Sequence, residues 1–186
     1  MFIEKSGKRL VVCICFTAIL WTTFFSCSFF EKWNSKDTAC SFSCTKVEDT
    51  FVRMEPDSLY SVIIRNNMGV CAISILGGAL LALPTIVCVV SNGKALGWQV
   101  ATIVRDDKHR NARILRLMPH GFEIFAFWLS GGMGFYILFF LVDLARNKII
   151  NVQKQLNIMF VGVLFSVTLV LFAALIEAYV SSRLFL

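Results

Sequence analysis

The amino-acid sequence predicts an all-α protein, a polytopic bundle of transmembrane helices, and three observations support this prediction. Apolar residues make up 57% of the 186 residues and charged residues only 16%, whereas a typical soluble domain has roughly 25% charged residues. The mean hydropathy is +0.72. The charges gather in clusters separated by long uncharged segments, each near the ~20 residues that cross the hydrocarbon core. We expect one membrane domain over residues 1–186.

The first predicted span covers residues 10–30. It follows Lys5, Lys8 and Arg9, and a basic flank before an apolar stretch is also typical of a cleaved signal peptide. The residues before Cys27 are bulky where a cleavage site needs small ones, which argues against cleavage and against a lipoprotein acylated at Cys27. We expect this segment to stay in the membrane as an anchored helix.

Three further spans are predicted over residues 68–91, 121–142 and 158–180. The second span contains Gly77, Gly78 and Pro84, and such breaks are tolerated in membrane helices whose neighbours satisfy the freed backbone groups. Pro119 stands just before the third span, where a missing N–H costs least. The fourth span has a single carboxylate, Glu177, near its end.

Residues 92–118 are predicted to hold a short re-entrant or partly inserted helix and then a surface helix. Residues 95–104 are apolar, but they are too few to cross a bilayer alone. In residues 105–118, arginines at every third position can form a face opposite the apolar residues, as in a helix that lies at the lipid headgroups.

The distribution of Lys and Arg gives an expected orientation. Four crossings with the N-terminus inside place ten basic residues inside and eight outside, whereas a fifth crossing by residues 95–104 places seven inside and eleven outside. The positive-inside rule therefore favours four crossings. We expect a multi-pass protein of the cell membrane, with the N-terminus and residues 92–118 in the cytoplasm. The polar loop over residues 31–67 would then lie outside, where it packs as a cap or meets a partner.

Cysteines and cofactor motifs narrow the function classes. Cys27, Cys40 and Cys44 are the three of the seven cysteines that lie at or in the polar loop, and Cys40–Cys44 is a candidate disulfide if that loop faces an oxidising compartment. The sequence has no paired Cys-x-x-Cys units, no Gly-rich phosphate loop and no serine nucleophile elbow. We expect no cofactor, no metal and no enzymatic activity, with a membrane-embedded hydrolase using His120 and Glu123 as the alternative.

Polar residues at membrane depth are the candidates for function, because burying them in lipid is costly. The candidate set is Asn66, Asn67, Asn92, Gly93, Pro119, His120, Gly121, Glu123 and Glu177. His120 and Glu123 are three residues apart and share a helix face. They are either a proton-handling or ligand-binding pair, or a neutral His bonded to a carbonyl beside a Glu that satisfies the helix end.

The paired Asn66-Asn67 and Asn92-Gly93 have two interpretations as well. They are either ordinary helix caps and turns, or, for Asn92, a group that bonds the backbone of a broken helix. We also predict that His120, Glu123 and Glu177 interact with one another or with Asn92, because isolated ionised groups in lipid are costly.

The order of these elements resembles the stage II sporulation protein M family over about residues 60–182. The elements are Asn66-Asn67, a Gly-rich segment ending in Asn92-Gly93, Pro119-His120-Gly121, and residues 174–179 around Glu177. Glu123 stands one position nearer His120 than in that family's Pro-His-Gly-x-x-Glu pattern. Residues 105–110 are charged where family members usually have a fully apolar helix.

This resemblance implies five spans, one of them short or bent, and a membrane component of a peptidoglycan-remodelling complex that acts during sporulation. Such proteins are thought to position separate cell-wall hydrolases without being hydrolases. Other relatives accompany circular bacteriocin gene sets, which implies peptide export, maturation or immunity.

We therefore expect a non-enzymatic membrane scaffold. Its expected partners are the lipid bilayer, other membrane or cell-wall proteins and a second copy of the chain. Nucleic acid is not expected, because the net charge of +6 fits anionic lipid headgroups. The rival hypothesis is a transport component in which Asn92, His120, Glu123 and Glu177 line a polar path.

Overall fold

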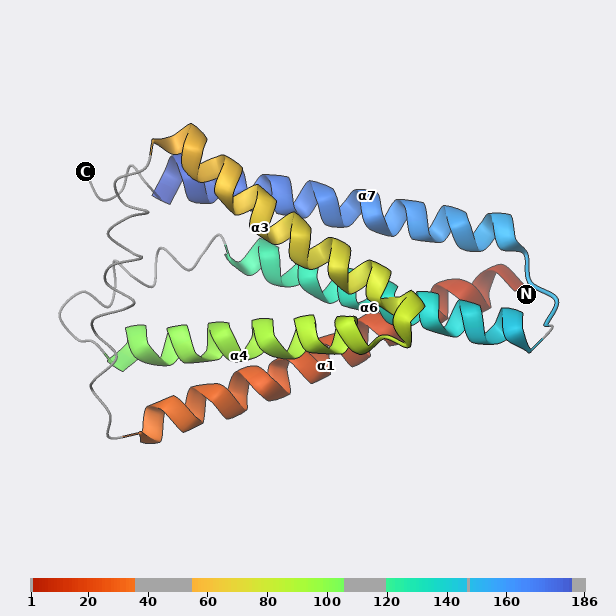
Figure 1. Cartoon of the computed structure of the whole chain (residues 1–186), viewed down its shortest axis with the longest axis horizontal. Coiled ribbons are helices and arrows are strands. Elements are labelled where there is room, and N and C mark those ends of the chain that lie inside the picture. Colours follow the sequence, from red (N-terminus) through yellow and green to blue (C-terminus); the bar gives the residue numbers. More distant parts are fainter. Residues whose placement is uncertain (1, 36–54, 106–119, 147, 182–186) are drawn as a thin grey trace.

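The computed structural model describes residues 2–35, 55–105, 120–146 and 148–181, and within them all regular structure is helical (Figure 1). The elements in chain order are α1 (Phe2–Asn34), α3 (Pro56–Leu76), η1 (Gly77–Leu80), α4 (Leu83–Arg105), α6 (His120–Ala145), α7 (Val152–Ile176) and η2 (Glu177–Ser181). Five helical segments are long and apolar enough to cross a membrane: Gly7–Asn34, Pro56–Leu80, Leu83–Arg105, His120–Ala145 and Val152–Tyr179. The predicted all-α class of polytopic helical membrane proteins is confirmed.

Three of the four predicted spans lie inside single helical segments, but the structure corrects the second. Residues 68–91 contain the end of α3, the short η1 and the start of α4. The chain reverses at Leu81 and Ala82, which have φ angles of 55° and 57°. Pro84 then lies in the first turn of α4, where its missing N–H costs little. An apolar hairpin and an apolar helix have the same hydropathy, so the sequence pattern did not separate them.

This correction changes the neighbouring segments too. The apolar residues 95–104 belong to α4 and do not form a separate re-entrant piece, and Asn92 and Gly93 lie in the middle of that helix. The polar loop expected over residues 31–67 is shorter, because α3 already begins at Pro56. Proline at the first helical position and Asp57 in the first turn both favour a helix start there.

The α3–α4 hairpin turns beside the middle of α6. Gly78 packs so closely on Gly134 that an added Cβ would lie 2.1 Å from the Gly134 carbonyl oxygen. Figure 1 shows the turn stopping short of the end that α6 reaches. The turn is apolar, and the N–H groups of Leu81 and Ala82 both donate to the Gly77 carbonyl, the Ala82 bond being 3.0 Å long. Such internal bonding is what hydrocarbon surroundings require.

α4 packs most extensively against α1, along a stripe of small residues. A Cβ added to Gly93 would lie 2.7 Å from the Trp21 carbonyl oxygen, and one added to Gly97 would lie 2.3 Å from that of Phe25. Two glycines four residues apart let helix backbones approach closely in a membrane. The Trp21 indole N–H also donates to Asn92 Oδ1 at 3.1 Å, which ties the two helices by a polar contact.

Polar contacts mark the two ends of the bundle. At one end, Arg105 Nη1 donates to the carbonyl oxygen of Ser35 at 2.6 Å, so α4 and α1 finish side by side. We call this the loop end, because α3 and α6 also begin there (Figure 1). At the opposite end, Asp143 accepts from Arg9 at 2.5 Å and from Lys148 at 2.6 Å. The start of α1 therefore lies at the end where α6 leads into α7.

This arrangement does not fit the expectation that the N-terminus and residues 92–118 share one side of the membrane. The described part of that segment, residues 92–105, runs toward the loop end, away from the start of α1. The reason is the unpredicted hairpin, which brings the chain back to the end from which α3 set out. Residues 106–118, with the expected surface helix, lie outside the described residues, as do Pro119, Cys40 and Cys44 of the candidate disulfide.

Candidate functional site

The candidate site is centred on the first turn of α6. His120 and Glu123 share one face of this turn, as their spacing predicts, and His120 Nδ1 lies 2.7 Å from Glu123 Oε2. The His120 side chain is 23% exposed, whereas the Glu123 side chain is only 7% exposed. A carboxyl group near a helix N-terminus is stabilised by the helix dipole. The pair therefore consists of a buried carboxyl and a partly exposed imidazole in contact with it.

The second partner of Glu123 comes from α3. Asn67 is 6% exposed, and its side-chain amide donates a hydrogen bond to Glu123 Oε1. Both carboxyl oxygens of Glu123 are thus engaged, one by Asn67 and one by His120. The neighbouring Asn66 is exposed and donates to Asn67 Oδ1 at 3.3 Å. Neither asparagine caps a helix, because both lie inside α3.

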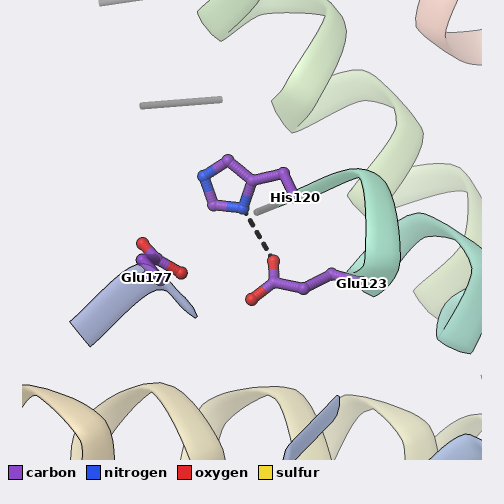
Figure 2. Close-up of side chains that lie close together, drawn as sticks. All are labelled: His120, Glu123 and Glu177. Carbon is purple, nitrogen blue, oxygen red and sulfur yellow. Dashed lines mark hydrogen bonds and ion pairs between the residues drawn. The ribbon is translucent and has the colours of Figure 1, made fainter. Parts of the chain in front are cut away.

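Glu177 completes the cluster from η2, the turn that follows α7. It is half-buried, and it begins η2, a five-residue π-helical turn that follows α7. Figure 2 shows its carboxyl group facing His120 and Glu123 across the gap between α7 and α6. Donor atoms from His120, Glu123 and Glu177 all lie within 4.8 Å of one another.

The predicted interaction among His120, Glu123 and Glu177 is present. The asparagine that contacts this cluster is Asn67, and not Asn92, which was the expected alternative partner. Asn92 bonds to Trp21 on the α1 side of α4, and Asn67 takes the place beside Glu123. No metal is expected from the sequence, but Glu177 places a third side chain of a metal-ligand type beside His120 and Glu123. That these residues carry function stays a prediction.

Imidazole nitrogen and carboxylate oxygen are ligand types that first-row divalent metal ions accept in proteins. Within the described residues, the set His120, Glu123 and Glu177 is the one group of three such side chains close enough to hold an ion. The same two carboxyls could instead share a proton, since two neighbouring carboxylates repel when both are ionised. The site can therefore hold a cation or a proton.

A cavity of about 660 Å³ lies beside this cluster, between α1, α4 and α6. Its walls are mainly aromatic and aliphatic, and its polar side chains are Thr22, Ser26 and His120, of which His120 belongs to the cluster. Trp128 also lines it, and no described residue accepts a hydrogen bond from its buried indole N–H. Of the four residues expected to line a polar path, His120 alone lines this cavity, so the convergence that the transport hypothesis requires is not formed there.

Comparison with known proteins gives one match. A family model described as stage II sporulation protein M matches residues 10–182, which include all five membrane-length helices except the first residues of α1. No curated protein and no solved structure matches the chain.

Proposed function

Because the chain belongs to the stage II sporulation protein M family, we propose that this multi-pass membrane protein is a non-enzymatic scaffold of the kind that serves a peptidoglycan-remodelling complex. The observation that carries the proposal is the family match over residues 10–182. The sequence also lacks the nucleophile and phosphate-binding motifs of familiar enzyme classes. The protein would act by holding other proteins in place.

The loop end is the surface that suits a partner. The contact between Arg105 and Ser35 brings the ends of α4 and α1 together, and the polar segments 106–119 and 36–54 follow these two helix ends in the sequence. The contact between the Tyr179 hydroxyl and Asp57 brings the end of the α7 segment to the same end. Three chain segments attached to the same end can together offer the contact area that a specific interface needs, which one short segment does not supply.

We propose further that the loop end faces the cytoplasm. Ten Lys and Arg residues stand at helix termini of the loop end or in the sequence segments attached to them, and six stand likewise at the opposite end. The ten are Lys32, Lys36, Lys46, Arg53, Arg105, Lys108, Arg110, Arg113, Arg116 and Arg183, and the six are Lys5, Lys8, Arg9, Arg146, Lys148 and Lys154. The positive-inside rule favours the richer end as cytoplasmic. Partners would then be cytoplasmic proteins or the cytoplasmic ends of membrane proteins, through which any cell-wall enzyme is positioned.

Reporter fusions test this orientation. A green fluorescent protein fused after Leu186 should fluoresce, because it folds in the cytoplasm, and an alkaline phosphatase at the same place should be inactive. Fusions made after Lys148, at the opposite end, should show the reverse pattern. Phosphatase activity after Leu186 together with fluorescence after Lys148 would show that the loop end faces outward.

Partner capture tests the scaffold itself. The chain isolated from its native membrane in mild detergent, after chemical cross-linking, is expected to carry a specific partner in constant ratio. Replacing residues 36–54 by a Gly/Ser segment of equal length should remove that partner, while the helical bundle keeps its thermal transition. Isolation of the intact chain as a monomer without a partner under every condition tried would contradict the proposal.

A further inference from the structure

We propose that His120, Glu123 and Glu177 form a binding site for a first-row divalent metal ion, and that Zn²⁺ is the ion it suits best. The three side chains come from two helical segments, α6 and the end of α7, and their donor atoms lie within 4.8 Å of one another. An ion there would join the two segments at the loop end. The site adds to the scaffold proposal and does not depend on it.

The spacing fits a small cation. Ligand atoms that bind one Zn²⁺ tetrahedrally at ~2.1 Å lie about 3.4 Å apart. The donor atoms here all lie within 4.8 Å of one another, and side-chain rotations can bring them to that spacing. In the opposite sense, His120 Nδ1 and Glu123 Oε2, now 2.7 Å apart, must separate slightly to admit the ion. Rotation of the side chains is enough for both adjustments, and the helical turns that carry them need not move.

The charge of the cluster favours a cation as well. Two carboxyl groups whose oxygen atoms lie within 4.8 Å of each other repel when both are ionised, and burial of Glu123 strengthens that repulsion. One protonated imidazole cannot balance two carboxylates. A divalent ion balances both, and it does so without leaving a net negative charge in the membrane, where uncompensated charge is most costly.

The surroundings resemble the support that metal ligands usually have. Ligating carboxylates are commonly held by a further hydrogen bond, and the buried Asn67 amide gives one to Glu123 Oε1. Independently, Glu177 begins a π-helical turn, a feature that occurs frequently at functional sites. Asn67 and Glu177 are polar, although the hydrophobic packing of the helices does not require polar side chains at these positions.

The donor set selects among ions. One imidazole with two carboxylates is a mixed nitrogen and oxygen set, whereas Mg²⁺ and Ca²⁺ favour oxygen ligands in larger number. Zn²⁺ binds such sets tetrahedrally, and three protein ligands leave one position for water or for a donor from a bound molecule. Cu²⁺ binds most such sets more tightly than Zn²⁺ but prefers a square-planar or tetragonal arrangement, so we expect Cu²⁺ to bind here as well and Zn²⁺ to match the tetrahedral geometry.

Metal content is measured on the full chain in mild detergent, after removal of any His tag. The protein is treated with EDTA, incubated with Zn²⁺ or Cu²⁺, desalted and analysed by mass spectrometry of the elements. We expect about one Zn²⁺ per chain and a higher melting temperature with Zn²⁺ than with EDTA. In Glu177→Gln and His120→Ala, both the bound Zn²⁺ and the shift in melting temperature should be lost.

Glu55→Gln is the matched control, since it removes an exposed carboxylate outside the cluster and should keep the ion. Co²⁺ substitution separates the site from the cysteines, because thiolate ligands give a near-ultraviolet charge-transfer band that imidazole and carboxylate do not. Wild-type protein without bound Zn²⁺, equal Zn²⁺ in Glu177→Gln, or a thiolate band in the Co²⁺ protein would each overturn the proposal. The absence of Zn²⁺ from the wild-type protein is measured without any variant that must fold. That result would leave proton sharing between the two carboxyls as the role of the cluster.

Discussion

Replacing Gly78 by alanine is expected to lower the free energy of unfolding by about 3 kcal/mol, near the upper part of the usual range for an overpacked site. The added Cβ would lie 2.1 Å from the carbonyl oxygen of Gly134 and 2.9 Å from its carbonyl carbon. These are backbone atoms of α6, which cannot turn aside as a flexible side chain can. The hairpin tip must therefore move away from α6, and it loses contacts along both arms.

Gly69→Ala is the control, because Gly69 lies in α3 and nothing is within 4 Å of a Cβ added there. Alanine is favoured over glycine inside a helix by up to ~1 kcal/mol, so this variant should be as stable as the wild type or more so. The measurement is unfolding in mixed micelles by increasing SDS, followed by circular dichroism. Equal stability of Gly78→Ala and the wild type would show that η1 does not approach α6 as closely as described.

The sequence predicted α1, α6 and α7 better than it predicted the α3–α4 hairpin. α1, α6 and α7 each contain a long uncharged run between charged flanks, and hydropathy detects such runs directly. The α3–α4 turn contains no charge, so hydropathy is continuous through it. The reversal depends on two residues with positive φ, Leu81 and Ala82, neither of which is a typical turn residue.

The position of residues 92–105, away from the start of α1, follows from the same hairpin. With one helix over residues 68–91, the chain crosses once between the polar loop and residue 92. With two helices it returns to the same end, and every later segment changes sides. The orientation was predicted from the distribution of Lys and Arg. An apolar turn of a few residues, far from those charges, changes which segments share an end of the bundle.

The candidate site was predicted in part for a comparable reason. His120 and Glu123 follow from helical spacing, which is local. The contacts of Glu123 with Asn67 and Glu177 join helices far apart in the sequence, and these contacts depend on which helix faces pack together. Polar residues in apolar segments identified the participants, Asn67 and Glu177 among them, but the single sequence did not distinguish Asn67 from Asn92 as the partner.

Asn67→Leu is expected to destabilise the bundle by about 3 kcal/mol, because a buried carboxyl that loses a hydrogen-bond donor costs more than the mean value of a hydrogen bond. The leucine is similar in size, so the loss reports on Glu123 Oε1 and not on a cavity. Asn66→Leu is the matched control on the same helix. Asn66 is exposed and has one long contact of 3.3 Å, so its replacement should change stability by less than ~0.5 kcal/mol.

A double-mutant cycle shows whether the effect of Asn67→Leu passes through Glu123. In the Glu123→Leu background the carboxyl is absent, so Asn67→Leu should cost little, and the coupling energy should be about 1–3 kcal/mol. Both variants are measured by the same SDS unfolding, with Asn66→Leu in each background. If Asn67→Leu costs the same with and without Glu123, the two side chains do not interact in the folded protein. The Asn67 amide would then support α3 through other contacts, and Glu123 would depend on the α6–α7 side of the cluster alone.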